Sequence, residues 1–158
     1  MPAKAIEIEA ILDPNKYPFI LNKGYETTPA ADTTIYTYKE SIGNIKRPAR
    51  EGYTFIGWNP EIPETMPADT FRTTAQWEVN QYRYVVYTSE TDSVETLVNY
   101  GETLEPLAEQ SKEGYTFKGW DIEQPQTMPA KDLIIRAMWE VNSYKFELYD
   151  GDVLYKAY

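Results

Sequence analysis

The octapeptide EGYTFIGW at residues 51–58 returns as EGYTFKGW at residues 113–120. The same spacing of 62 residues relates the TMPA motifs at residues 65–68 and 127–130. No gap separates these blocks, and 19 of the 32 positions in residues 51–82 are identical in the second copy. Self-similarity at a fixed period of this length predicts a tandem array of small structural units.

The repeat continues upstream of this stretch with fewer identities. At the same spacing, Ile35 stands opposite Leu97 and Ile42 opposite Leu104. Further upstream the first copy carries about three extra residues. We expect them in the turn of residues 23–34, because surface turns tolerate insertions.

The two ends of the chain resemble parts of the repeat. Residues 1–19 match residues 128–146 at nine of 19 positions. This predicts the C-terminal strand of a preceding repeat at 1–16, full repeats at 17–81 and 82–143, and the start of a further repeat at 144–158. We expect a piece of a longer array; the alternative is a permuted unit that begins at the Met-Pro-Ala motif.

Apolar residues alternate with polar ones after each Met-Pro-Ala motif, which is typical of a strand with one buried face. The inward positions are Phe71, Thr73, Ala75 and Trp77 in one copy, and Leu133, Ile135, Ala137 and Trp139 in the other. Further strands are expected at residues 82–87, 94–100 and 144–149, and at both Tyr-Thr-Phe-x-Gly-Trp segments. The glycine of that segment, Gly57 or Gly119, predicts a bulge or a close approach of another backbone.

No stretch shows a helical period of 12 or more residues. Residues 104–112 could hold one short helical turn, which Pro106 limits. The predicted fold class is therefore mainly β, with small α+β modules of four short strands and at most one short helix. A unit of about 60 residues is marginally stable alone, so we expect aromatic packing or contact with neighbouring repeats to support it.

Composition excludes several classes of function. The chain of 158 residues has no Cys and no His, which removes disulfides, the common zinc sites and the Ser-His-Asp triad. The net charge of −10 argues against nucleic acid and anionic membranes as partners. With no long apolar run and no signal-peptide pattern, we expect no membrane insertion.

The consensus Glu-Gly-Tyr-Thr-Phe-x-Gly-Trp, Thr-Met-Pro-Ala and Ala-x-Trp-Glu-Val-Asn resembles the Listeria–Bacteroides repeat family, which includes the B repeats of internalin B. The resemblance covers essentially the whole chain. It implies a β-grasp-like (ubiquitin-like) module, repeated in tandem in a secreted or wall-attached bacterial surface protein that acts as a stalk or in adhesion. It implies no catalytic residues and no cofactor.

The repeated aromatic residues have two interpretations. Trp58, Trp77, Trp120 and Trp139 could form a stacking platform for sugars, or they could be core residues. The core is favoured, since aromatic side chains carry most of the burial in small units. Tyr36, Tyr87 and Tyr149 are the better candidates for exposed aromatic residues that line a groove and bind a ligand, against the alternative of ordinary strand surface.

Lys46, Arg47 and Arg50 form the one basic cluster, which corresponds to AEQSK at residues 108–112. They could bind an anionic glycan or an acidic neighbouring repeat, but three screened charges give weak binding, and a solvated loop is favoured. The acidic segments at residues 88–92 and 150–152 do not match a calcium loop, so no metal site is expected.

The leading hypothesis is a non-enzymatic array on the bacterial cell surface that acts as a stalk or spacer and as an adhesin. The alternatives are a specific binding module for a host protein or glycan, and an accessory domain of a larger secreted enzyme. Expected partners are neighbouring repeats of the same parent chain. Because residues 1–13 and 144–158 are complementary parts of one unit, head-to-tail self-association through strand edges is also expected.

Overall fold

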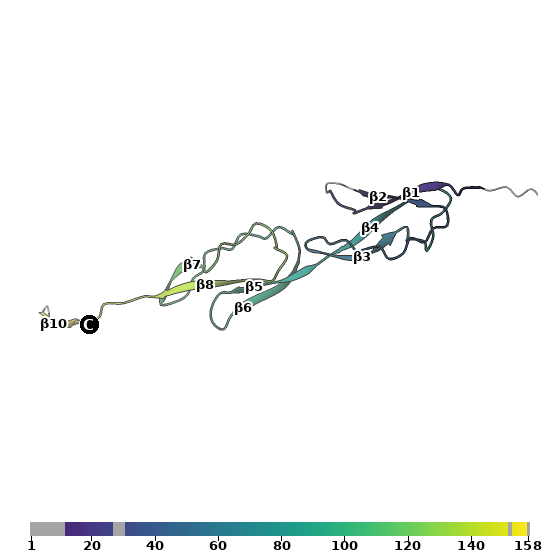
Figure 1. The fold of residues 1–158 in the computed structure, drawn as a ribbon. Coiled ribbons are helices and arrows are strands. Elements are labelled where there is room, and N and C mark those ends of the chain that lie inside the picture. Colours follow the sequence, from purple (N-terminus) through teal and green to yellow (C-terminus); the bar gives the residue numbers. More distant parts are fainter. Residues whose placement is uncertain (1–11, 27–30, 152, 158) are drawn as a thin grey trace, which may run out of the picture. The chain divides into compact units, whose positions relative to one another are not determined.

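The computed structural model describes residues 12–26, 31–151 and 153–157. These residues contain ten strands and no helix (Figure 1). The chain divides into two compact units, residues 1–78 and 79–158. Residues 1–11, which make up most of the predicted strand of a preceding repeat at 1–16, lie outside the described residues.

The first unit has one four-stranded sheet in the order β2-β1-β4-β3 (Figure 1). Its strands are β1 (Lys16–Asn22), β2 (Ala31–Thr37), β3 (Tyr53–Asn59) and β4 (Phe71–Val79). β1 and β2 form an antiparallel hairpin, and β1 runs parallel to β4 with Phe19 opposite Phe71. The two central strands are therefore the first and the last of the unit.

The second unit repeats this order as β6-β5-β8-β7. Its strands are β5 (Gln81–Tyr87), β6 (Ser93–Asn99), β7 (Tyr115–Trp120) and β8 (Leu133–Val141). β5 is antiparallel to β6 and parallel to β8. A separate antiparallel pair follows, formed by β9 (Glu147–Asp150) and β10 (Val153–Ala157).

Several predictions from the sequence are confirmed. The β4 and β8 faces alternate in burial as expected, with Ala75 and Ile135 buried. The β7–β8 register shifts between Phe117 and Trp120, which places the predicted bulge at Gly119. The loop between β1 and β2 spans residues 23–30, against 88–92 between β5 and β6, so the three extra residues lie in this turn.

The structure settles one possibility that the sequence left open and corrects one prediction of secondary structure. Residues 104–112, which could have held one short helical turn, form none; Leu104 is buried, and the N–H of Leu107 donates to the side chain of Gln124. The strand expected at residues 144–149 begins only at Glu147. Tyr144 and Phe146 are 76% and 61% exposed, and among the described residues they have no strand to pair with.

Each unit has its own core, built around the methionine of the Thr-Met-Pro-Ala motif. Met66 is 1% exposed and packs with Phe19 and Ile42, while Met128 is 1% exposed and packs with Leu104 and Ile135. The motif is attached to the segment after the hairpin by backbone bonds that recur in both units. Met66 N–H donates to the Glu40 carbonyl, and Met128 N–H to the Glu102 carbonyl, both at 2.9 Å.

One polar side chain lies in the core of the first unit. Thr73 is 2% exposed, and its hydroxyl donates to the carbonyl oxygen of Pro60 at 2.6 Å. The equivalent residue of the second unit is Ile135, which is fully buried. A buried hydroxyl needs such a partner, so the hydrogen bond is what allows threonine at a position that takes isoleucine in the other copy.

Candidate functional site

The repeated tryptophan on the last strand of each sheet holds the end of the first strand. The indole N–H of Trp77 donates to the carbonyl oxygen of Lys23 at 2.7 Å. Trp139 donates in the same way to Thr88 at 2.9 Å. A buried indole N–H is usually bonded, and here that bond fixes the hairpin loop of each unit beside the tryptophan.

The same tryptophans belong to small aromatic clusters. Phe55 lies edge-on to Trp58 and Trp77, with ring centroids 5.3 and 5.6 Å apart. Phe117, Trp120 and Trp139 repeat this arrangement, and Trp120 also packs against the core around Met128. All four tryptophans are half-buried. They contribute to packing, as expected, but the buried residues of the two cores are others: Phe19, Ile42 and Met66 in the first unit, and methionine and aliphatic residues around Met128 in the second.

In the first unit Tyr25 lies against Trp77, with centroids 5.8 Å apart in an edge-to-face arrangement. Its hydroxyl donates to the carbonyl oxygen of Ala49 at 3.1 Å. The guanidinium carbon of Arg50 lies 5.0 Å from the centre of the Tyr25 ring and 3.6 Å from that of Tyr53. Cation–π contacts of this kind hold Arg50 between the two rings.

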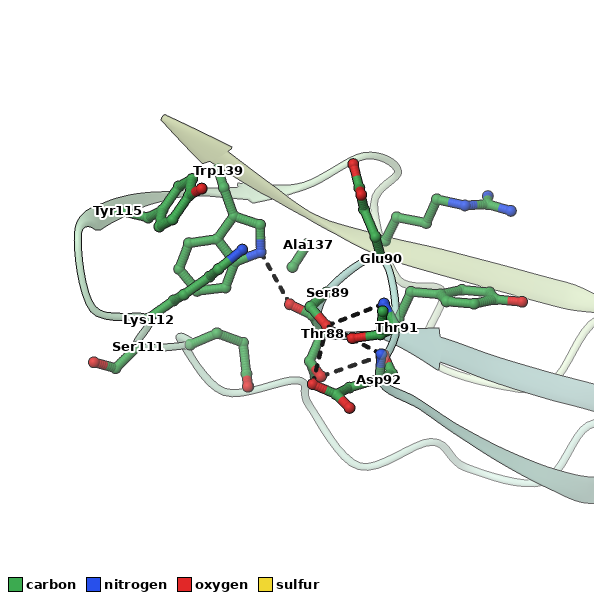
Figure 2. A pocket seen from close by; sticks show the side chains of 13 residues that line it. Thr88, Ser89, Glu90, Thr91, Asp92, Ser111, Lys112, Tyr115, Ala137 and Trp139 are labelled. Carbon is green, nitrogen blue, oxygen red and sulfur yellow. Dashed lines mark hydrogen bonds between the residues drawn. The ribbon is translucent and has the colours of Figure 1, made fainter. Parts of the chain in front are cut away.

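In the second unit a cleft of ≈ 1010 Å³ lies beside the equivalent tryptophan (Figure 2). Trp139, Tyr115 and Lys112 border one side, and the loop of residues 88–92 borders the other. The Lys112 ammonium lies 4.0 Å from the centre of the Tyr115 ring and 5.9 Å from that of Trp139. The cleft therefore combines aromatic surface with hydrogen-bonding groups, as ligand sites do.

The short loop beside the cleft is held by its own hydrogen bonds. The N–H of Thr88 donates to the carbonyl of Asp92 at 3.0 Å, and the Ser89 hydroxyl donates to the Asp92 carboxylate at 3.0 Å. These bonds direct the side chains of Ser89 and Asp92 toward each other (Figure 2). Glu90, at the tip, is exposed.

Tyr87 and Arg136 form a further wall of the cleft. The guanidinium of Arg136 lies 5.0 Å from the centre of the half-buried Tyr87 ring and 3.8 Å from the carboxylate of Asp121. Tyr87 was predicted to be an exposed aromatic residue lining a groove; the structure places it at the cleft, but half-buried under Arg136 and not fully exposed. Its predicted role in binding stays a prediction.

The other two predicted tyrosines lie elsewhere. Tyr36 is not an exposed residue, which corrects the expectation. It stands opposite Tyr17 in the hairpin, so its ring points to the core face and packs edge-on against Phe19 at 5.6 Å. Tyr149 on β9 is 55% exposed, and its hydroxyl donates to the carboxylate of Glu147. Hydrogen bonds from Lys145, the larger effect, and from Tyr149 lower the pKa of Glu147. The bond to Glu147 raises the pKa of Tyr149.

The predicted basic cluster is divided. Lys46 and Arg47 are exposed, and Arg47 borders a second cavity of ≈ 710 Å³ together with Trp58 and Glu61. Arg50 is half-buried in its contacts with Tyr25 and Tyr53, so it does not join them as a free cation. The equivalent residue Lys112 makes the same kind of contact, which explains why only this position of the cluster is basic in both repeats.

The clearest ion pair lies on the β5–β6 hairpin. Arg83 donates two hydrogen bonds to the carboxylate of Glu95, at 2.7 and 2.8 Å. The bonds lower the pKa of Glu95 and raise that of Arg83. Both side chains are about half exposed, so the pair is screened by salt and contributes little to stability.

Neither a metal site nor a membrane helix is found in the part of the chain that the structure describes. There, no group of three or more acidic side chains is placed to hold a metal ion. In the same residues no helix is long and apolar enough to cross a membrane.

Sequence reasoning missed Tyr25 and the cleft. The signal that could have found them is the turn itself, where the first repeat has Lys-Gly-Tyr-Glu at residues 23–26 and the second has the shorter TSETD at residues 88–92. A glycine followed by an aromatic residue in the longer turn indicates that the turn folds back onto the sheet. Comparing the two turns requires the ends of the flanking strands, which only the structure defines.

Comparison with known proteins finds the same two repeats that the sequence shows. The sequence pattern of the Listeria-Bacteroides repeat domain matches residues 18–77 and 84–135. A protein of Evansella cellulosilytica named as a Gly-rich membrane protein is 32% identical over 139 aligned residues, covering 73% of this chain and 16% of that protein. Internalin H of Listeria monocytogenes is 34% identical over 92 residues, covering 51% of this chain and 16% of its own length.

A second Evansella cellulosilytica protein, named as a membrane protein, is 27% identical over 132 residues. The chain spans only 16–20% of the length of these three relatives. No solved structure matches it with significance. The two matched segments together cover more than half of the chain, and each overlaps all four strands of one four-stranded sheet. The chain belongs to the Listeria-Bacteroides repeat family and contains two tandem copies of its domain.

Proposed function

We propose that this chain is a non-enzymatic spacer segment of an extracellular bacterial surface protein, in which the repeats also offer weak adhesive sites. The observation that carries the proposal is the parallel pairing of the first and last strands of each unit. β1 pairs with β4 through residues 19–22 and 71–74, and β5 pairs with β8 through residues 84–87 and 133–136.

This pairing suits a segment under tension. A chain pulled from both ends loads the start of β1 and the end of β4 in opposite directions. Because the two strands are parallel neighbours, the force shears the hydrogen bonds between them together instead of opening them one after another. Each unit also has its own buried cluster, so repeats can be added without redesigning a shared core.

The same topology supports the β-grasp-like assignment as part of this proposal. In each unit a hairpin and a final strand place the parallel pair at the centre, with β2 and β3, or β6 and β7, at the edges. The segment that follows the hairpin crosses to the far edge without a helix in the described residues. The unit would then be a reduced β-grasp module.

Pulling single molecules tests the mechanical role. The chain has no Cys, so handles can be attached only at cysteines introduced at chosen positions. Handles at Asp13→Cys and Glu78→Cys load β1 and β4 in shear, and the first unit should resist a high force. The control pair Asp13→Cys and Tyr38→Cys opens the β1–β2 hairpin from one end and should yield at a much lower force. Equal forces for the two pairs would overturn the spacer proposal.

Relatives named as membrane proteins and as an internalin support a position at the cell surface. The experiment is protease shaving of intact bacteria that carry the parent gene. Peptides from these repeats should appear in the shaved fraction before cells lyse. Their recovery only after lysis would contradict an extracellular position.

Adhesion is the second candidate, and the cleft of the second unit favours it. A host protein or a glycan remains the expected class of partner, and several weak sites on one array would gain from multivalency where geometry lets them engage together. Surface immobilisation of the chain tests this, because dwell time on a ligand should rise with the number of repeats if the sites act together.

A further inference from the structure

The two units present the same wall of residues beside their repeated tryptophan, with one difference. Four positions correspond at the constant spacing of 62 residues: Ala49 and Ser111, Arg50 and Lys112, Tyr53 and Tyr115, and Trp77 and Trp139. The hairpin loops correspond at a spacing of 65, since Lys23 and Thr88 accept the same indole bond. At that spacing Glu90 of the second unit stands where the first unit has Tyr25.

In the first unit the chain supplies its own occupant for this wall. Tyr25 contacts the Trp77 ring, bonds to the Ala49 carbonyl and lies under the Arg50 guanidinium. Gly24 allows this, because it has φ +76° and its Cα lies so close to β4 that a Cβ would be 2.4 Å from the Ala75 carbonyl oxygen. The longer loop thus lies on the sheet and places a phenol ring against the tryptophan.

In the second unit the occupant is missing and the wall remains. The loop of residues 88–92 is three residues shorter and is bonded to itself through Ser89 and Asp92. Trp139, Tyr115 and Lys112 border the cleft of ≈ 1010 Å³ that results. The loop cannot place an aromatic residue on Trp139, because its sequence TSETD contains none, and Glu90 at the position of Tyr25 is exposed.

We propose that the cleft of the second unit binds a tyrosine side chain of a partner polypeptide. The ring would lie edge-on against Trp139, under the Lys112 ammonium, with its hydroxyl toward the main chain at Ser111. Each of these three groups is the counterpart of one that holds Tyr25 in the first unit. The cleft exceeds one phenol ring in size, so residues that flank the tyrosine have room beside it.

Charge in the cleft also fits a neutral aromatic group. The lining residues carry no net charge, since the two cations Lys112 and Arg136 equal the two carboxylates Glu90 and Asp92 in number. A phenol gains from the tryptophan ring and from the ammonium over its face, and brings no charge to be desolvated. The inference adds to the adhesive role proposed above and is independent of the spacer role, which its failure would leave intact.

The test follows the four tryptophan indole N–H signals by two-dimensional NMR of the ¹⁵N-labelled chain. The probe is the blocked peptide Lys-Gly-Tyr-Glu, which copies residues 23–26. The Trp139 signal should shift and saturate with a Kd of about 1 mM, typical of one anchored side chain. The Trp77 signal should stay unchanged, because Tyr25 already covers that site. The same peptide with alanine for tyrosine should have no effect.

Reciprocal variants separate the proposal from nonspecific binding. Tyr25→Ala uncovers Trp77, so the Trp77 signal should begin to respond to the peptide. Grafting residues 23–30 in place of residues 88–92 supplies an occupant to the second unit, and the Trp139 signal should stop responding. A loop graft that folds and leaves the response unchanged overturns the proposal, whether or not Tyr25→Ala folds.

Three other results would also overturn it. One is a Trp139 signal that does not move at about 10 mM peptide, ten times the expected Kd. Another is an equal response to the alanine peptide. The third is a response to neutral disaccharides in the absence of any response to the tyrosine peptide, which would assign the cleft to glycans.

Discussion

The indole N–H of Trp139 donates a hydrogen bond to the carbonyl oxygen of Thr88 at 2.9 Å. The bond joins β8 to the residue that directly follows β5 in the same sheet. Its counterpart in the first unit, between Trp77 and Lys23, is 2.7 Å long. The bond explains why tryptophan is repeated at this position, since phenylalanine would keep the ring contacts with Phe117 and lose the donor.

Trp139→Phe tests this interpretation. The variant leaves the half-buried Thr88 carbonyl without its donor, and the second unit should lose about 1–3 kcal/mol of its free energy of unfolding. Trp77→Phe is the matched variant and should weaken the first unit by a similar amount. Urea denaturation measures both. Two variants as stable as the unchanged chain would mean that water replaces the indole at no cost.

Truncation of the buried methionines tests whether each unit depends on its own core. Met66→Ala leaves a cavity beside Phe19 and should cost about 2–5 kcal/mol, enough to unfold a unit of this size. Hydrogen exchange should rise throughout β1 and β4 while β8 keeps its protection. Met128→Ala should give the reverse pattern. Equal loss of protection in β4 and β8 from either variant would show that the two cores unfold together.

The strands were the predictable part of this fold. Alternation along residues 71–79 and 133–141 follows from the period of a β-strand, and burial of Ala75 and Ile135 follows from that alternation. The inserted residues between β1 and β2 could be located because turns tolerate length changes. These inferences need only local pattern and one alignment of the chain with itself.

What could not be predicted depends on register between distant segments. Tyr36 reads as a surface residue by itself, and only its pairing with Tyr17 turns it toward Phe19. Arg50 reads as a free cation, and only the fold brings Tyr25 over it. The cleft depends on distant segments even more, because it forms where the shorter loop of residues 88–92 leaves the surface beside Trp139 uncovered.

The pairing of Arg83 with Glu95 predicts a pH dependence confined to the second unit. The hydrogen bonds from Arg83 lower the pKa of Glu95 below its ordinary value of 4.5. A carboxylate with a lowered folded-state pKa stabilises the fold above its unfolded-state pKa, and this contribution is lost as the pH falls through the folded-state value. The free energy of unfolding of the second unit should therefore decrease by a small amount as the pH is lowered below 4.5.

Glu95→Gln is the control for that titration. It should remove this part of the pH dependence and leave the unit nearly as stable at pH 3, because the pair is exposed and weak. Carbon-detected NMR of the Glu95 carboxyl group gives the pKa directly. A midpoint at or above 4.5 would show that the pair does not persist in solution.

Gly24 tests how the first unit covers its tryptophan. Gly24 and Gly43 have φ values of +76° and +68°, so alanine at either position bears a left-handed backbone that costs about 1–2 kcal/mol. Only at Gly24 would the new Cβ also meet backbone, at 2.4 Å from the Ala75 oxygen, whereas nothing lies within 4 Å at Gly43. Gly24→Ala should therefore destabilise the first unit clearly more than Gly43→Ala in urea denaturation.

The difference between the two alanine variants also has a local signature. Because the clash lies between the loop and β4, Gly24→Ala should lift the loop and move Tyr25 away from Trp77, which changes the chemical shift of the Trp77 indole N–H. Gly43→Ala should leave that signal in place, since Gly43 follows β2 in the chain and a Cβ there would have no atom within 4 Å, the Trp77 and Tyr25 rings included. If both variants shift it equally, the close approach of Gly24 to Ala75 is not what holds Tyr25 on the sheet.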